Sequence, residues 1–471
     1  MTRVNRVRRP VIVLATLLVA LAALPARAQA PEKIGEYEPL SIGTPHPYPG
    51  YGAGPIEQEV RFPGATYVRL HFVRFALNDG DWVELTSPDG AQVWRYSGKG
   101  PHGTGDFWAN TIFGEAAIIR FFAPQGGGYG FDIDGAGRGT VPLDGSGPSP
   151  DSICGTQDWK DARCYQGGAY ATEYERGRGA VLALIGCCSS CTAFKVSDGG
   201  QFMTNNHCTS STSGVQSTEL RFEYQTPGCA SGSPTYTAAV MGSSMLKTDY
   251  TLDYTLFTTT GDATSIPCLG LEARLPPVGE RIYIAGHPNG GPKKLSIESD
   301  QNAGGLCKVD ASPYSGRDAT SDIGYYCDTI GGSSGSPVLS ASSHKVVGLH
   351  HYGGCLNSGV RVDRIYPQIS GLLGSCDGGG GGGETCGNGT CGVGEHKCNC
   401  PADCGTPAAT ETGKCKDGLN NDCDGAKDCA DPDCTTDPLC QTCKPKGAIC
   451  SVNADCCSKN CKNYGSFRAC R

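Results

Sequence analysis

The pattern of hydrophobic and polar positions in the first third of the chain is dominated by short alternating segments. Residues 67–75 read YVRLHFVRF, so large apolar side chains recur at every second position. This period of two is typical of a strand that buries one face. Further short apolar segments follow at residues 82–86, 93–96, 117–122 and 129–133. Strands at this spacing predict a β-sandwich between residues 31 and 149.

Beyond this module the chain also reads as β-structure, and no segment carries a sustained helical apolar repeat. A linker rich in proline, glycine and serine covers residues 141–152, and glycines fill residues 378–383. The region between the linkers, residues 150–377, is long enough for two packed six-stranded barrels. We therefore predict an all-β chain with a double-barrel domain at residues 150–377 and a flexible linker at residues 378–385.

The first thirty residues predict a secretory signal. Four arginines lie between residues 3 and 9, residues 11–24 are apolar, and small residues stand at Ala26 and Ala28. A membrane anchor needs about 20 apolar residues, and this run is shorter. We expect cleavage of residues 1–30 near Ala28 or Ala30 and a secreted, extracellular product without a membrane span. An Arg-Arg pair at residues 8–9 leaves a twin-arginine export route as the less favoured alternative.

Cysteine content and net charge narrow the class of protein further. The sequence has 28 cysteines, none of them before Cys154. In an exported chain they predict disulfides rather than metal thiolates, because the compartment is oxidising. Their numbers before and after the glycine linker are both even, so each region can close its own bridges. The formal net charge of −8 argues against binding to nucleic acid.

The strongest candidate for catalysis is the segment GSSGSP at residues 332–337. Acyl transfer needs an exposed hydroxyl beside backbone amides that hold the developing oxyanion. Ser334 supplies the hydroxyl, and we expect the amides of Gly332 and Ser334 to form the oxyanion hole. An α/β-hydrolase elbow requires Gly-x-Ser-x-Gly, and Ser336 stands where the last glycine is needed. The sequence therefore predicts Ser334 as a nucleophile outside that class.

A histidine and an aspartate complete a candidate triad in the order His, Asp, Ser. His207, in the segment TNNHC, is the candidate base. A metal-ligand role is the alternative, but no second His/Cys pair with zinc spacing lies nearby. Asp253 precedes an apolar strand, where a carboxylate can be buried against the imidazole. Asp249 has a similar setting, and we prefer Asp253 because a longer apolar strand follows it.

The region with these motifs resembles the chymotrypsin-fold serine peptidases, nearest to the bacterial lysyl endopeptidases and the glutamyl endopeptidases. The matching segments occur in order at residues 191–192, 206–208, 224–229, 253–256, 287–289, 332–337 and 346–351. The resemblance implies a triad of His207, Asp253 and Ser334. It also implies the disulfides Cys191–Cys208, Cys164–Cys229 and Cys154–Cys355. It gives no partners for Cys187, Cys188, Cys268, Cys307, Cys327 and Cys376, and a Cys307–Cys327 pair is suggested only by their hairpin-like separation.

Two departures from the family bear on activation and on specificity. Trypsin has an aspartate before the nucleophile that pairs with the new N-terminus, and this chain has Ser333, so we expect the site to assemble without that switch. Where lysyl endopeptidases carry their pocket acid, this chain has Asn357. Asp328 stands where trypsin has its pocket aspartate, which favours cleavage after Lys or Arg. A purely structural Asp328 is one alternative. Acidic specificity through a strand histidine such as His351 is another, although lysyl endopeptidases share that histidine.

Three further modules flank the catalytic region. The strand order of residues 31–149 is similar to a CUB-like domain, which implies a structural or adhesive role, with a removable propeptide as the alternative. Residues 386–440 are rich in cysteine, and part of them resembles thrombospondin type 3 calcium repeats. The expected calcium ligands are Asn420, Asp422, Asp424, Asp428, Asp431 and Asp433. A solvated acidic loop is the alternative.

The last module, residues 441–471, resembles an inhibitor cystine knot. That resemblance implies the pairs Cys443–Cys457, Cys450–Cys461 and Cys456–Cys470. A segment this small depends on its bridges for stability. Attached to a protease, such a module suggests binding to a surface or matrix.

Taken together, the sequence predicts a secreted serine endopeptidase that acts on proteins or peptides, with a preference for basic residues. No cofactor is needed for this chemistry, and calcium in the tail is the one bound ion that we expect. The rival hypothesis is a non-catalytic adhesive protein with a decayed protease fold. All three residue types of the triad are present, which favours the enzyme.

Overall fold

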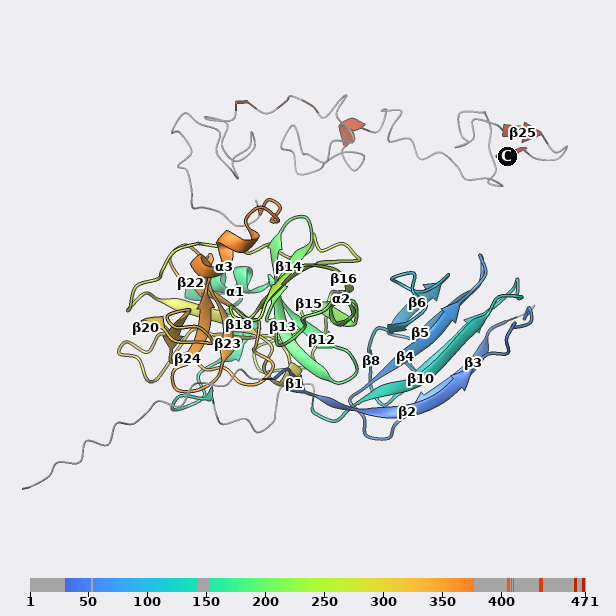
Figure 1. Cartoon of the computed structure of the whole chain (residues 1–471), viewed down its shortest axis with the longest axis horizontal. Helices are drawn as coiled ribbons and strands as arrows, with labels where there is room; N and C mark the ends of the chain where they lie inside the picture. The colour runs from blue at the N-terminus through green and yellow to red at the C-terminus, as the bar shows by residue number, and fades with distance from the viewer. Residues whose placement is uncertain are drawn as a thin grey trace, which may run out of the picture.

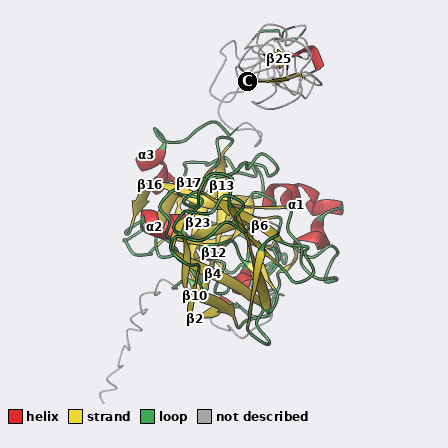
Figure 2. Ribbon diagram, turned by 90° about the vertical axis from the view of Figure 1, so that its right-hand side faces the viewer, coloured by secondary structure: helices red, strands yellow, loops and turns green. Residues whose placement is uncertain are grey.

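The computed structural model describes residues 30–51, 54–142 and 152–376, together with 405–406, 408, 410, 432–434, 461–463 and 468–470 of the tail. Strands fill its centre, and the few helices lie at the periphery (Figure 2). These helices are α1 (Ala171–Gly177), α2 (Thr212–Gln216) and α3 (Val362–Ile369), with 3-10 turns at Ala162–Tyr165, Gly168–Tyr170 and Pro288–Gly290 (η4). The predicted all-β class is confirmed. No helix in these ranges is long and apolar enough to cross a membrane.

Residues 35–139 form two antiparallel sheets with a shared aromatic core. One sheet has the order β2-β10-β4-β7 with β8 also on β4, and the other has the order β3-β9-β5-β6. The strands are β2 (Gly35–Gly43), β3 (Ile56–Arg61), β4 (Tyr67–Ala76), β5 (Trp82–Thr86), β6 (Val93–Ser97), β7 (Phe107–Trp108), β8 (Ile112–Phe113), β9 (Ala116–Phe122) and β10 (Gly130–Gly139). Phe72 stacks on Phe107 and meets Phe131 edge to face. We call this unit the sandwich.

The first barrel of the following region closes with six strands. Its order is β13-β12-β15-β16-β17-β14, and pairing of β13 with β14 completes the ring. The strands are β12 (Ala180–Ile185), β13 (Ser189–Ser197), β14 (Gln201–Thr204), β15 (Thr218–Phe222), β16 (Ala238–Asp249) and β17 (Tyr254–Thr259). A short N-terminal strand, β1 (Glu32–Lys33), adds to the edge of β13.

The second sheet holds the nucleophile segment and has the order β11-β19-β18-β22-β23-β24-β21-β20. Its strands are β11 (Lys160–Asp161), β18 (Ile282–Gly286), β19 (Lys294–Ser296), β20 (Val309–Tyr314), β21 (Asp322–Tyr325), β22 (Pro337–Ser340), β23 (Val346–Tyr352) and β24 (Asn357–Arg361). A bridge between Arg281 and Lys308, just before β18 and β20, joins those two strands, so six of the eight strands close into a second barrel. One buried apolar cluster joins it to the first barrel and contains Phe194, Tyr254 and Leu349. Residues on the two sheets can therefore meet at a common site.

The sandwich docks on the first barrel, on the side of β12 and β15 (Figure 1). Arg69 of the sandwich is buried and donates to the carbonyl oxygens of Leu184 and Gly186 at 3.2 and 2.6 Å. Glu219 of the barrel accepts the Thr111 amide at 2.8 Å and pairs with Arg221 at 2.7 Å. This contact explains why the start of β4 is buried on both faces, whereas the alternation of residues 67–75 predicts one buried face.

We expect Glu219→Ala to destabilise the chain by about 3–5 kcal/mol, because it leaves the cations of Arg69 and Arg221 buried without their carboxylate. Urea denaturation measures this loss. The matched control is Glu57→Ala, which breaks an exposed pair with Arg120 at 2.9 Å and is expected to cost less than about 1 kcal/mol. Equal small losses for both variants would contradict a structural role for the interface.

Candidate active site

Ser334 lies between the two barrels and is held by backbone bonds on both sides. Its carbonyl oxygen accepts the Thr192 amide at 2.8 Å, and the next amide, of Gly335, donates to the His350 carbonyl oxygen at 2.9 Å. Gly335 has φ +87°, and a Cβ there would lie 2.0 Å from the Thr192 oxygen, so only glycine fits. Ser334 Oγ and His207 Nε2 are both buried and make no hydrogen bond within the described residues. Such catalytic contacts often tighten only when substrate binds.

The loop before Ser334 is arranged so that the Gly332 amide is available to an oxyanion. The carbonyl oxygen of Gly331 accepts the Asn289 amide at 2.6 Å. Because a trans peptide directs its oxygen and its N–H to opposite sides, the Gly332 amide points away from Asn289. The Gly332 carbonyl is fixed in turn by the Thr192 hydroxyl at 3.0 Å. Gly332 has φ +88°, a conformation that favours glycine.

Asp253 is the residue just before β17, and its side chain contacts His207. Its carboxylate accepts His207 Nδ1 at 2.8 Å through one oxygen and the His207 amide at 3.0 Å through the other. Burial alone would raise the pKa of Asp253, but hydrogen bonds from His207 and His351 hold that pKa well below its usual range. The competing candidate, Asp249, instead accepts the Leu252 amide at 2.8 Å and caps the turn that leads to Asp253.

The cysteines next to the candidate base form a bridge and leave no metal site. Ligand atoms of Cys191, His207 and Cys208 lie within 4.8 Å of one another. The two sulfurs are bonded to each other, so neither is available as a thiolate ligand. The other pairs are Cys154–Cys355, Cys164–Cys229, Cys187–Cys188, Cys268–Cys376 and Cys307–Cys327. Together with Cys191–Cys208, they include the three bridges that the resemblance implies for this region and the pair suggested by separation.

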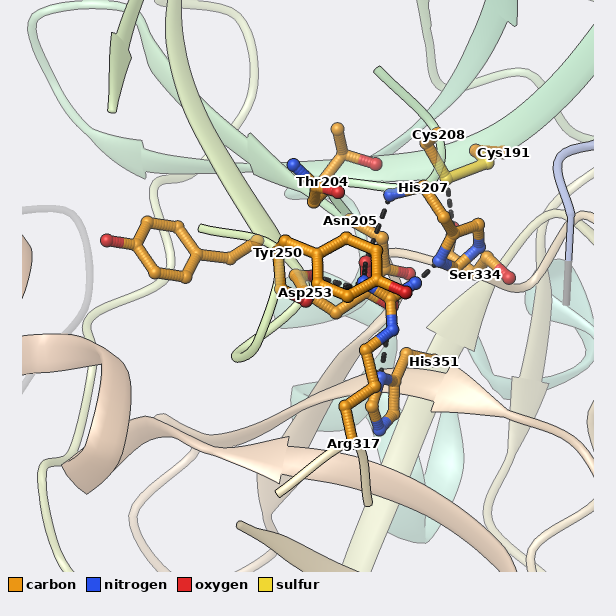
Figure 3. A network of polar contacts seen from close by, with 12 residues as sticks. Cys191, Thr204, Asn205, His207, Cys208, Tyr250, Asp253, Arg317, Ser334 and His351 are labelled. Atoms are coloured by element: carbon orange, nitrogen blue, oxygen red, sulfur yellow. Dashed lines mark hydrogen bonds and ion pairs between the residues drawn. A yellow bond between two sulfur atoms is a disulfide. The ribbon is translucent and has the colours of Figure 1, made fainter. Parts of the chain in front are cut away.

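His351 lies behind the triad rather than beside a substrate pocket. One ring nitrogen contacts the Asp253 carboxylate at 3.0 Å, and the other contacts Asp322 at 2.6 Å. The ring is fully buried. Figure 3 shows His207, His351 and Arg317 converging on Asp253. Sequence reasoning missed Asp322 and Arg317, because no motif surrounds them and only strand pairing in the second sheet brings them here.

The other two predicted specificity residues also bind the protein's own backbone. Asp328 is buried, and its two oxygens accept the amides of Cys154 and Asp158 at 2.8 and 2.7 Å. Burial raises the pKa of Asp328 to about 6. Asn357 donates to the carbonyl oxygens of Ser152 and Cys327, each at 2.9 Å. Both side chains therefore anchor the start of the catalytic region, and neither carries a free charge for a substrate.

The predicted tail sites fall almost entirely outside the described residues. Of the six expected calcium ligands, only Asp433 is described, as an exposed residue of the 3-10 turn Pro432–Cys434. Two knot cysteines lie in paired strands, β25 (Cys461–Asn463) and β26 (Arg468–Cys470), opposite each other in register. The three predicted knot bridges, like residues 1–29 of the signal and the linker at 143–151, lie outside the described residues.

The buried His351 predicts a loss of stability at alkaline pH. Burial would lower its pKa, but Asp322 and Asp253 outweigh that effect and raise the pKa to about 9. The folded state therefore holds this proton more tightly than the unfolded chain, whose histidines titrate near pH 6.5. The contribution is fully present below about pH 6.5 and is lost as the pH rises through about 9. Urea midpoints from pH 6 to 10 measure it, and His351→Gln should flatten the dependence; an unchanged slope in that variant would contradict this source.

Comparisons with known proteins give one family match, one curated relative and several solved structures. Residues 191–349 match the family model of the trypsin-like peptidase domain. A curated relative, the secreted RxLR effector protein 73 of Plasmopara viticola, is 30% identical over 326 residues, which cover 64% of this chain and 78% of that protein. A serine endoprotease from Yersinia pestis has 13% identity and a TM-score of 0.33, covering 44% of this chain and 67% of its own. Rv3671c from M. tuberculosis H37Rv, in an inactive form, has 13% identity and a TM-score of 0.31, covering 49% and 98%.

Proposed function

The chain belongs to the family of the Plasmopara viticola relative and has the fold of a trypsin-like serine protease, and from this premise we propose that it is a secreted serine endopeptidase with the triad His207, Asp253 and Ser334. The observation that carries the proposal is the Asp253 carboxylate, which binds both the Nδ1 atom and the backbone amide of His207. In a protein that had lost catalysis, we would not expect this contact to persist beside a serine whose hydroxyl makes no hydrogen bond within the described residues.

The proposed mechanism is acyl transfer. Asp253 holds the Nδ1 proton, which leaves Nε2 of His207 free to take the proton of Ser334. The Ser334 oxygen then attacks the peptide carbonyl, and the amides of Gly332 and Ser334 bind the oxyanion. His207 protonates the leaving amine, water enters, and a second round of the same proton transfers releases the acid product. No cofactor takes part in these steps.

Secretion and a permanently attached sandwich form part of the proposal. The relative is named a secreted protein, and all twelve cysteines of residues 152–376 are paired, which suits an oxidising compartment. The buried charges of Arg69, Glu219 and Arg221 at the sandwich interface support a module that stays in place after export. Calcium binding by the tail and attachment to a surface or matrix through the accessory modules remain proposals that rest on the sequence.

For specificity, basic preference through Asp328 has lost its main support, because that carboxylate is occupied by two amides. A specific observation favours an acidic side chain. His350 is buried beside the nucleophile segment and its Nδ1 contacts the Tyr325 hydroxyl at 2.8 Å. Burial keeps the pKa of Tyr325 well above its usual range, so the hydroxyl donates and the proton of His350 sits on Nε2. By strict hydrogen-bond geometry, that Nε2 and the buried Thr329 hydroxyl have no partner among the described residues. Burial lowers the pKa of His350, and a backbone hydrogen bond with Ser358 opposes this effect in part.

A peptide library profile tests both the activity and the specificity. We expect internal cleavage after Glu or Asp, and we expect His350→Leu to reduce it at least tenfold, because the substrate carboxylate loses its donor. Asp328→Asn should leave the ratio of acidic to basic cleavage unchanged within about twofold. If the wild type cleaves after Lys or Arg and Asp328→Asn loses this cleavage, the acidic assignment is wrong and Asp328 determines a basic specificity. Cleavage that persists in Ser334→Ala would reject the proposed enzyme.

A further inference from the structure

We propose that Arg317 is a positioning residue of the catalytic site, which fixes the Asp253 carboxylate from the second barrel and offsets part of its negative charge beside His207. This inference rests on the proposed function, because it concerns the same triad. It goes beyond that function by adding a residue that none of the sequence motifs contains.

The contact geometry is that of a buried ion pair between two separate parts of the fold. Arg317 lies in the loop between β20 and β21, and its Nη1 is 3.3 Å from one Asp253 oxygen. The same nitrogen donates to the Tyr250 carbonyl at 2.6 Å, and the guanidinium lies 4.3 Å from the centre of the Tyr250 ring. Only 11% of the Arg317 side chain is exposed, whereas Asp253 is fully buried. Solvent therefore screens this pair weakly.

The Asp253 carboxylate is shared among three nitrogen-bearing side chains. One oxygen accepts the His207 amide and meets Arg317, and the other contacts Nδ1 of both His207 and His351 (Figure 3). Asp322 lies behind His351 and compensates its charge. Two further titratable groups face this cluster from β23: His350, which is held neutral by burial that lowers its pKa to about 3, and Tyr352, whose ring stacks on His351 at 3.9 Å.

The sign of the effect follows from these charges. Asp253 stabilises the protonated, charged form of His207. A permanent cation beside the same carboxylate opposes that stabilisation, because like charges disfavour one another. Arg317 cannot lose its proton in this pH range, so its effect is constant. Arg317 therefore weakens the attraction between Asp253 and the His207 cation, and its removal should strengthen that attraction.

The test is the acid limb of kcat/KM against pH for the full chain. Arg317→Gln should move that limb upward by about 0.5–1 pH unit, which is a loss of about three- to tenfold at pH 5, with little change at pH 8. Arg317→Lys keeps the charge and should restore most of the shift. The matched control is Arg364→Gln. Arg364 lies in α3 and pairs at 3.0 Å with Asp318, on the loop that carries Arg317, rather than with Asp253. Its profile should equal that of the wild type.

A second variant covers the case in which Arg317→Gln does not fold. Tyr250 is 72% exposed, so Tyr250→Ala should fold while removing the ring that supports the guanidinium. We expect a smaller shift in the same direction. Suppose that the wild type is active and that Arg317→Gln, or Tyr250→Ala if the first variant does not fold, has the same acid limb as the wild type. That result would overturn this inference and leave the proposed function standing. A wild type without peptidase activity would overturn the proposed function instead.

Discussion

Asp253→Asn is expected to lower kcat about 10,000-fold, whereas Asp249→Asn should keep kcat within about threefold of the wild type. An amide at position 253 preserves the shape of the site, but it presents a donor as well as an acceptor to His207. The Nδ1 proton then loses its carboxylate acceptor, and Nε2 is no longer held as the free base that Ser334 requires. The loss should appear in kcat far more than in KM, because substrate contacts are untouched.

The Asp253 and Asp249 variants form a well-matched comparison, because both aspartates precede similar sequences and differ only in their positions in the turn. Asp249 ends β16 and caps the turn through the Leu252 amide. Asp253 has φ +46°, a left-handed conformation that Asp tolerates better than most residues, and this bend aims its side chain at His207. Steady-state kinetics on one peptide substrate measure both variants. Equal losses, or a larger loss for Asp249→Asn, would contradict the assignment of the carboxylate role to Asp253.

Gly332→Ala is expected to lower kcat by about 100- to 1,000-fold, the range for loss of one oxyanion-hole donor. A Cβ at this position would lie 2.6 Å from the His287 carbonyl oxygen and 2.8 Å from the Asn289 nitrogen. Both neighbours are backbone atoms, so the loop must move, and with it the amide that binds the oxyanion. Affinity for a peptide boronic acid, which forms a tetrahedral adduct, should fall in parallel with kcat.

The control for this variant is Gly279→Ala. Gly279 has almost the same backbone conformation, φ +89°, but a Cβ there would meet no atom within 4 Å. It therefore reproduces the conformational strain of the substitution without the collision beside the nucleophile. Its kcat should remain near that of the wild type. A Gly332→Ala enzyme as active as Gly279→Ala would show that the Gly332 amide does not stabilise the oxyanion.

The sequence was a good guide to what local chemistry determines. The glycines around Ser334 and the residues flanking His207 reflect backbone requirements of their loops. Both residues could therefore be proposed as catalytic from their sequence neighbours alone. The alternation in residues 67–75 likewise predicts a strand, and β4 covers it. Asp253 could be preferred over Asp249 only by strand length, and the turn geometry that separates them appears only in the structure.

What the sequence could not supply are contacts between distant segments. His351 and Arg317 meet Asp253, and Asp322 meets His351, because the two barrels pack together, and no spacing rule relates their positions. The same is true of Asp328, which the sequence places where trypsin has its pocket aspartate but which accepts the amides of residues 154 and 158. A motif gives the position of a residue in a loop. The role of that residue depends on which groups of the protein already form hydrogen bonds or ion pairs with its side chain.

The central claim, a working triad, is tested most directly by labelling the secreted chain with a fluorophosphonate and mapping the adduct by mass spectrometry. A phosphonyl group on Ser334 requires an activated hydroxyl, so we predict one adduct per chain at Ser334, and none in Ser334→Ala. His207→Ala should slow labelling by at least about 1,000-fold, since the base is lost. A folded wild-type chain that stays unlabelled, or that labels as fast without His207, would contradict a working triad.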